Sequence, residues 1–233
     1  MRREWQRPVL CLITDRRRLA AALAQSEHDA SWLLASQIDG AIRGGTDVVQ
    51  IRERDLDSRM LVQVVQAAMA AASRSRVVVV VNDRVDVAIA APSGGVHLRE
   101  DGVPNHVARR LLGEAQVVGR SVHDHASVAE VLDADYLIAG SVFETSSKPG
   151  ATSRLGLDGL RKVVERAGTC PVWAIGGVTP ERAGEIAETG AAGVAAISMF
   201  IPSCRPADLA NSMQELTAHL RFSFDTAWKR SLR

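Results

Sequence analysis

Polar side chains suited to chemistry follow short apolar segments of this sequence. Arg52 and Arg54 flank Glu53 just after the segment VVQI, and His123 follows the segment VVGRSV. A guanidinium group matches a carboxylate or phosphate bidentately. An unperturbed imidazole titrates near about pH 6.5, so it can serve as an acid or a base close to neutrality. These residues predict a site for an anionic substrate with a group for proton transfer.

A second set of residues suits a phosphate monoester. Gly176 and Gly177 follow the apolar segment VWAI, and Ile197 and Ser198 follow the segment GVAA. Paired glycines let backbone N–H groups approach phosphate oxygens, and a helix expected to start near Thr179 would direct its positive dipole end there. We therefore expect phosphate at these two turns, although a glycine pair alone also suits a plain tight turn.

The single residues also have structural interpretations. The run Asn82–Arg84 follows VVVVV, and because Asn and Asp are favoured N-caps, helix capping explains this run best when it is taken alone. Arg52 and Arg54 alone could equally be solvated loop charges. The neighbours of His97 suggest a packing role. The functional hypothesis therefore rests on the whole set of residues.

Alternating segments of two kinds must position these side chains. The uninterrupted VVVVV run is typical of a strand that is buried on both faces. Eight strands alternating with eight helices predict an α/β fold, a single (β/α)8 TIM barrel over residues 1–220, with an open doubly wound sheet as the alternative. Residues 221–233 are expected to form a C-terminal tail with Trp228 as an anchor. The expected strands are 9–14, 47–51, 77–81, 95–98, 116–119, 136–139, 172–175 and 193–197, and the expected helices are 30–43, 58–73, 87–91, 104–112, 127–132, 157–166, 180–188 and 206–219.

Composition argues against several other classes of protein. The chain has 233 residues, of which 46% are hydrophobic and only 4% aromatic, so Val, Ile, Leu and Ala must build the core. With 28 basic and 27 acidic residues, the net charge of +1 gives no overall field for nucleic acid or a membrane surface. The cysteines are far apart, and neither a signal peptide nor a membrane-spanning run is evident. We expect a soluble, cytoplasmic protein.

Several longer motifs carry a resemblance to a known family. Through them the chain resembles the thiamine-phosphate synthase superfamily over nearly the whole barrel. The resemblance implies one of two reactions: a synthase joins a pyrimidine diphosphate to a thiazole phosphate with Mg²⁺, and a thiazole tautomerase isomerises a thiazole carboxylate phosphate to its aromatic form without a cofactor. The motifs are LITD at 12–15, VQIRER at 49–54, VNDRVDVAIA at 81–90, GVHL at 95–98, GRSVH at 119–123, AIGGVTPER at 174–182 and AAISMF at 195–200.

The details of the motifs resemble the tautomerase branch more closely. The segment GSVFETSSKPG at 140–150 looks like the tautomerase loop, and the synthase normally has lysine at the position of Arg54. GRSVH is similar to the motif that supplies the catalytic histidine of the tautomerase, which falls on His123. We therefore expect a thiazole tautomerase, with the synthase as the alternative and a non-catalytic sensor of thiamine intermediates as a third hypothesis.

The resemblance also implies roles for the other site residues. Asp83 matches the first Mg²⁺ ligand of the synthase, but the second aligns with Gly102, and Asp101 lies one residue early. The expected partner is a small phosphorylated thiazole, and a homodimer is a candidate assembly; neither nucleic acid nor a membrane is expected. Substrate binding is expected from Gln50, Arg52, Arg54, Asn82, Ser121, Thr145, Ser147 and Lys148, and phosphate binding from Gly176, Gly177, Ile197 and Ser198.

Overall fold

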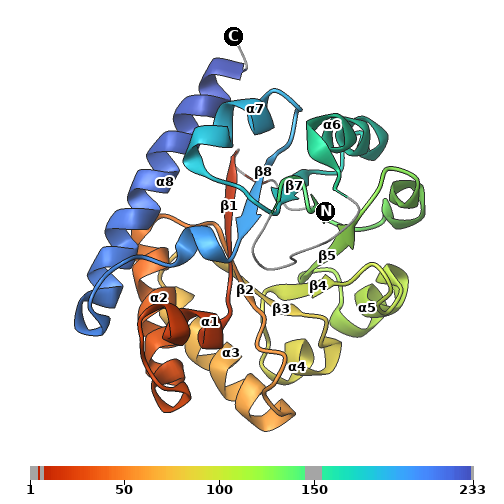
Figure 1. Ribbon diagram of the computed structural model, residues 1–233. Coiled ribbons are helices and arrows are strands. Elements are labelled where there is room, and N and C mark those ends of the chain that lie inside the picture. The colour runs from red at the N-terminus through yellow and green to blue at the C-terminus, as the bar shows by residue number, and fades with distance from the viewer. Residues whose placement is uncertain (1–4, 6–7, 145–153, 232–233) are drawn as a thin grey trace.

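Eight parallel strands form a closed barrel in the computed structural model, which describes residues 5, 8–144 and 154–231 (Figure 1). The strands pair in chain order, and β1 also pairs with β8, which closes the barrel. The predicted (β/α)8 barrel is therefore confirmed, and the open sheet is excluded. The strands are β1 (Val9–Ile13), β2 (Val48–Ile51), β3 (Val78–Asn82), β4 (Gly95–Leu98), β5 (Val117–Val122), β6 (Tyr136–Gly140), β7 (Val172–Ile175) and β8 (Gly193–Ala196).

The helices surround the barrel, and several of them differ from the predicted ones. The helix predicted at 127–132 is a 3-10 segment, Ser127–Val131, and a short helix was not predicted at Arg16–Ala22. That helix begins where the Asp15 side chain accepts a hydrogen bond from the N–H of Arg18. The α-helices are α1 (Arg16–Ala22), α2 (Ala30–Gly44), α3 (Ser58–Ala72), α4 (Val85–Ala90), α5 (Asn105–Leu112), α6 (Gly156–Ala167), α7 (Ala183–Ala187) and α8 (Leu209–Ser231).

The last helix, α8, is longer than the sequence predicted. It continues past residue 220 to Ser231 and packs along α2 and against α7 (Figure 1). Phe224 and Trp228 lie on the buried face of α8, and the indole N–H of Trp228 donates to the carbonyl of Ala191 at 2.9 Å. The boundary that was predicted at residue 220 therefore lies inside a continuous helix.

The inside of the barrel changes from apolar to polar along its axis. Near the N-terminal ends of the strands, the rings of Tyr136 and Trp173 stack with their centroids 4.0 Å apart. Gly119 makes room for this stack, since a Cβ there would lie 2.1 Å from the Tyr136 ring. Toward the C-terminal ends, the inward side chains are polar, with Gln50 and His97 among them. The aromatic pair thus forms an apolar floor below a polar mouth.

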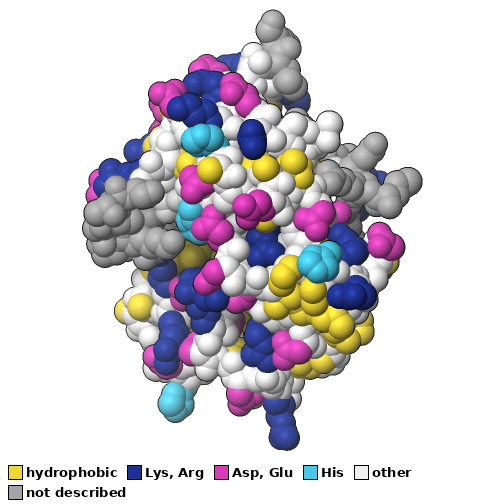
Figure 2. Space-filling view, turned by 90° about the vertical axis from the view of Figure 1, so that its right-hand side faces the viewer, with side chains coloured by type: hydrophobic (Ala, Val, Ile, Leu, Met, Phe, Trp, Pro, Cys, Tyr) yellow, Lys and Arg dark blue, Asp and Glu magenta, His cyan; other side chains and the backbone are white. Residues whose placement is uncertain are grey.

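The face of the molecule in Figure 2 shows no large patch of one charge. On the face in Figure 2, basic and acidic side chains are interspersed, and hydrophobic side chains gather at the lower right. This distribution is consistent with the net charge of +1. Among the described helices, none is both long enough and apolar enough to cross a bilayer.

Candidate active site

A cavity of about 500 Å³ opens at the C-terminal ends of the strands. Nine of the predicted site residues line it: Gln50, Arg52, Arg54, Asn82, Asp101, Ser121, His123, Gly176 and Ile197. Such a mouth is where functional groups of TIM barrels gather. Two smaller spaces adjoin it, one lined by Asp83 and the other by Gly177 and Ser198. Thr145, Ser147 and Lys148 lie outside the described residues.

Two sides of this cavity differ in chemistry. We call the side after β2–β4 the charged wall, made by Arg52, Arg54, Asp83, Arg99 and Asp101. We call the side after β7 and β8 the glycine wall, made by Gly176, Gly177, Ile197 and Ser198.

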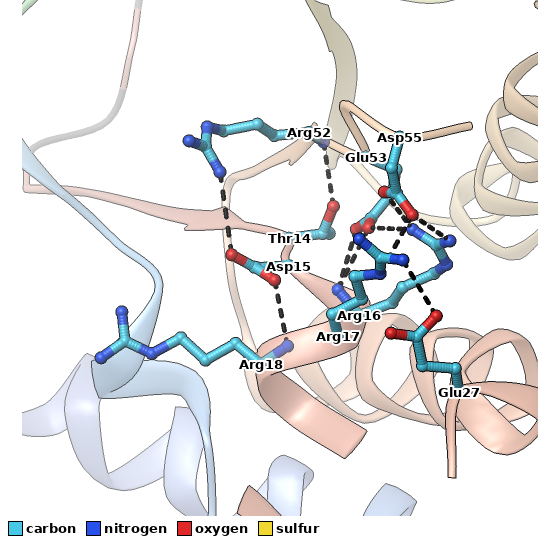
Figure 3. A network of polar contacts seen from close by, with 9 residues as sticks. All are labelled: Thr14, Asp15, Arg16, Arg17, Arg18, Glu27, Arg52, Glu53 and Asp55. Atoms are coloured by element: carbon cyan, nitrogen blue, oxygen red, sulfur yellow. Dashed lines mark hydrogen bonds and ion pairs between the residues drawn. The ribbon is translucent and has the colours of Figure 1, made fainter. Parts of the chain in front are cut away.

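Arg52 and Arg54 project into the cavity because Glu53, between them, is anchored elsewhere. The buried Glu53 carboxylate accepts from the N–H of Arg16 at 3.1 and 3.2 Å and from its guanidinium at 3.2 Å. The Arg52 N–H donates to Thr14 Oγ1 at 3.0 Å, and its guanidinium points away from Glu53 (Figure 3). Burial, and then the neighbouring Arg54, lowers the pKa of Arg52. An anion bound here would relieve this repulsion.

Arg120, the arginine of the GRSVH motif, lies on β5 and holds a neighbouring loop in place. Successive side chains of a strand face opposite sides, so Arg120 turns outward beneath the β4–α5 loop. Its buried guanidinium donates to Asn105 Oδ1 at 2.9 Å, to the carbonyl of Val103 at 2.7 Å and to the carbonyl of Arg99. Arg120 therefore fixes the backbone of the loop that carries Arg99, Glu100 and Asp101.

Ser121 faces inward from the same strand. Its Oγ lies 2.9 Å from Nε2 of His97, which is buried on β4. Burial, with a smaller effect of Arg120, lowers the pKa of His97 to about 3, so its ring is neutral near pH 7. The neutral ring stacks on Tyr136, with centroids 5.6 Å apart. His97 thus combines the predicted packing role with a hydrogen bond that orients Ser121.

His123 is oriented by a residue that the sequence did not single out. Glu100 Oε2 lies 2.8 Å from Nδ1 of His123, and Glu100 Oε1 accepts from the His123 N–H at 3.3 Å. Within the described part of the chain, nothing bonds the other ring nitrogen, Nε2. A carboxylate on one imidazole nitrogen with the other left for substrate is an arrangement that general acid–base catalysis uses.

Asp83 and Asp101 converge on a single atom of Arg99. Its Nε lies 2.9 Å from Asp83 Oδ2 and 3.3 Å from Asp101 Oδ1. The one-residue offset of Asp101 in the sequence therefore does not separate the two carboxylates in space. Asp83 also has a φ of +60°, a conformation that costs a non-glycine residue roughly 1–2 kcal/mol. Strain of this kind tends to persist at functional sites.

The glycine wall depends on backbone conformation. Gly176 and Gly177 have φ values of +95° and +63°, which side-chain-bearing residues rarely adopt. A Cβ on Gly176 would lie 2.6 Å from the Cβ of Ser141, and one on Gly177 would lie 2.4 Å from a carbonyl oxygen of the loop after β6. The guanidinium of Arg182 donates to the Gly177 carbonyl at 2.6 Å and so steadies this turn.

Helices contribute less to the glycine wall than the sequence predicted. The single helix expected at 180–188 is a 3-10 turn, Pro180–Arg182, followed by the five-residue α7. A short helix aligns few peptide dipoles, so its field at the turn is weaker than that of the longer helix. Ser198 starts a second 3-10 turn, Ser198–Phe200. Phosphate binding here would therefore depend mainly on N–H groups and the Ser198 hydroxyl.

Comparisons with known proteins agree with this architecture. A family model described as "Thiamine monophosphate synthase" matches residues 9–200. The thiamine-phosphate synthase of Moorella thermoacetica is 38% identical over 186 residues, which cover 79% of this chain and 88% of that protein. The one of Natronomonas pharaonis is 42% identical over 185 residues, which cover 78% and 86%.

A solved structure points the same way. Thiamine phosphate pyrophosphorylase from Pyrococcus furiosus matches with a TM-score of 0.76 and 31% identity, covering 94% of this chain and 96% of its own. The names of these relatives favour the synthase over the tautomerase that the sequence motifs placed first.

Proposed function

Since this chain belongs to the thiamine monophosphate synthase family, we propose that it joins a pyrimidine diphosphate to a thiazole phosphate, with release of diphosphate. It is thus an enzyme of thiamine biosynthesis, and the synthase reaction is the specific proposal. The observation that carries it is the convergence of Asp83 and Asp101 on one point of the charged wall, next to Arg52 and Arg54.

The two carboxylates fit the Mg²⁺ that the synthase branch employs. Magnesium takes oxygen ligands, usually one or two carboxylates completed by substrate phosphates and water. Asp83 and Asp101 supply such a pair, and both already contact one positive group, Arg99. Among the described residues, no group of three or more His, Cys, Asp or Glu side chains is placed to hold a metal, so the remaining ligands would come from diphosphate and water. When bound there, Mg²⁺ would neutralise negative charge on the diphosphate.

The charged wall suits the diphosphate end of the first substrate. As the carbon–oxygen bond to diphosphate breaks, negative charge builds on the departing oxygen, and guanidinium groups fixed nearby stabilise it. Arg52 and Arg54 are placed for this by the anchored Glu53. Gln50 Oε1 is buried without a hydrogen-bond partner in the described part of the chain, so it offers an acceptor to the pyrimidine ring.

The glycine wall suits the phosphate of the second substrate. The turns at Gly177 and Ser198 follow β7 and β8, and β1 separates β8 from the strand that precedes the arginines; these turns supply N–H groups and a hydroxyl. A phosphate held there would direct the thiazole ring into the shared cavity, where its nitrogen can attack the carbon that loses diphosphate. Holding two reactants in one cavity removes much of the entropic cost of their meeting.

A second candidate function, the thiazole tautomerase, is favoured by the pair Glu100–His123. In that reaction a base removes the proton from the carbon bearing the carboxylate, and an acid protonates the exocyclic carbon, so that the ring becomes aromatic. His123, held by Glu100 at 2.8 Å, has the geometry for both steps. Arg52 and Arg54 would then hold the carboxylate of the thiazole.

A two-arm assay distinguishes these functions. One arm supplies pyrimidine diphosphate, aromatic thiazole phosphate and Mg²⁺ with this protein alone. The other supplies the unaromatised thiazole carboxylate phosphate together with a separate synthase. We expect thiamine phosphate in the first arm. Acceleration in the second arm only, lost in His123→Asn, would replace the proposal with the tautomerase, and ligand binding without product in either arm would indicate a sensor.

A further inference from the structure

Arg99 occupies the place where a cation would contact Asp83 and Asp101. Its guanidinium contacts both carboxylates, with Nε at 2.9 and 3.3 Å and NH2 at 3.4 Å from Asp101 Oδ2. A divalent ion bound to the same carboxylate oxygens would lie in contact with the guanidinium, and the two positive charges would repel each other. Arg99 and a metal ion therefore exclude each other at this pair of carboxylates.

The surroundings let the Arg99 side chain move while its backbone stays in place. Buried Arg120 donates to the Arg99 carbonyl, and the Gly102 N–H donates to the same oxygen at 3.0 Å. The Arg99 side chain itself is 51% exposed, and that of Asp101 is 77% exposed. Release of the guanidinium from the carboxylates thus requires only rotation of side-chain bonds at the mouth of the cavity.

We propose that Arg99 is an internal counter-ion that competes with the divalent cation for Asp83 and Asp101. In the protein without ligands it neutralises the two carboxylates and keeps the affinity for a free cation low. A bound diphosphate offers the guanidinium a better, charge-assisted acceptor, which frees the carboxylates for the cation. By linkage, diphosphate and cation then strengthen each other's binding. This last step rests on the proposed function, whereas the competition itself does not.

The test measures binding of Mn²⁺ alone, by electron paramagnetic resonance of the free ion, without any substrate. Removing one positive charge beside a doubly charged ion at contact distance is expected to tighten its binding by about tenfold or more. We expect this gain in Arg99→Gln, whereas Arg99→Lys should bind Mn²⁺ about as the unchanged protein does. Arg84→Gln is the matched control, because Arg84 is a neighbouring exposed arginine that pairs with Asp86 instead. Adding Asp83→Asn to Arg99→Gln should abolish the gain.

Equal Mn²⁺ affinity in Arg99→Gln and the unchanged protein would overturn the proposal, as would a gain that survives Asp83→Asn. Thermal unfolding of each variant checks that it folds, and Arg99→Ala repeats the test should the glutamine variant fail to do so. Because no substrate is present, these outcomes are separate from those of the two-arm assay. A protein that makes no thiamine phosphate could still show the competition, and an active synthase could lack it.

Discussion

The charged wall and the glycine wall of the cavity offer anions different groups. The charged wall presents guanidinium and carboxylate side chains held from below by buried partners, Glu53 under its arginines and Arg120 under the loop of Arg99. The glycine wall presents main chain, in conformations that a side chain would prevent. Side chains can exchange partners, as we propose for Arg99, whereas a backbone turn is fixed. We infer that the charged wall handles the group that departs and the glycine wall the group that stays.

The largest effect is expected from the charged wall. Asp83→Asn removes one of the two carboxylates that would hold Mg²⁺, so we expect kcat for thiamine phosphate formation to fall by roughly 10²–10³-fold, in line with losses of a charge-stabilising group elsewhere. Asp86→Asn is the matched control, since Asp86 is exposed and pairs with Arg84 outside the cavity. Steady-state rates at saturating Mg²⁺ measure the effect. Retention of more than about a tenth of the rate would argue that Asp83 holds no cation.

A substitution in the glycine wall should weaken binding of the second substrate, thiazole phosphate. Gly177→Ala places a Cβ 2.4 Å from a carbonyl oxygen, so the turn must shift, and we expect KM for thiazole phosphate to rise by about 10–100-fold. Gly168 has a similar φ of +59° with nothing within 4 Å of a Cβ. Gly168→Ala should therefore strain the backbone without creating a close contact and leave KM unchanged. Equal KM changes in the two variants would mean that strain, and not the phosphate turn, is responsible.

A smaller effect is expected when the charge of Arg52 is kept but its shape is changed. Lysine cannot bind diphosphate with a planar fork, so Arg52→Lys should raise KM for the pyrimidine diphosphate by about tenfold. Arg17→Lys is the control, because Arg17 belongs to the same network but pairs with Glu27 and Asp55 away from the cavity (Figure 3). Initial rates over a range of pyrimidine diphosphate concentrations give KM for both variants. An unchanged KM in Arg52→Lys would remove Arg52 from the binding site.

The smallest effect concerns the anchor of the charged wall. The hydrogen bond from Arg16 lowers the pKa of Asp55 to about 2. A carboxyl whose pKa is depressed on folding stabilises the protein above its unfolded pKa of about 3.9, and this contribution disappears as the pH falls through about 2. We expect Asp55→Asn to lose less stability than the unchanged protein between about pH 4 and pH 2. Urea midpoints over this range measure it, and parallel curves would contradict the assignment.

The barrel could be predicted because its strands are apolar runs of the right length, VVVVV above all, separated by amphipathic helices. Helix α1 was missed because three arginines open it and it has only seven residues, which is too few for a periodicity to emerge. The sequence left the loop after β4 open for a different reason. An ungapped alignment places Gly102 where the synthase has its second carboxylate, and only the folded loop shows Asp101 at the same Arg99 atom as Asp83.

From residue types and places after strands, the sequence could predict that these polar side chains meet in one cavity, but it could not predict their partners. Glu100 was missed because the sequence gives no measure of its closeness to His123, which lies 23 residues further along the chain. Arg120 could have been found, since an arginine within the apolar run of β5 must have buried acceptors. Its role under the Arg99 loop follows from strand alternation once the strand is known.

Separate binding measurements on the two walls test the division of labour between them most directly. Calorimetry would give dissociation constants of inorganic diphosphate and of thiazole phosphate for the unchanged protein, Arg52→Gln and Gly177→Ala. We predict that Arg52→Gln, which also removes the charge, weakens binding of diphosphate by more than about tenfold and leaves binding of thiazole phosphate unaffected. Gly177→Ala should weaken binding of thiazole phosphate and leave binding of diphosphate unaffected. If each substitution weakened both ligands equally, or if the effects were exchanged, the two walls would not bind separate substrates, and the proposed arrangement of the synthase reaction would be wrong.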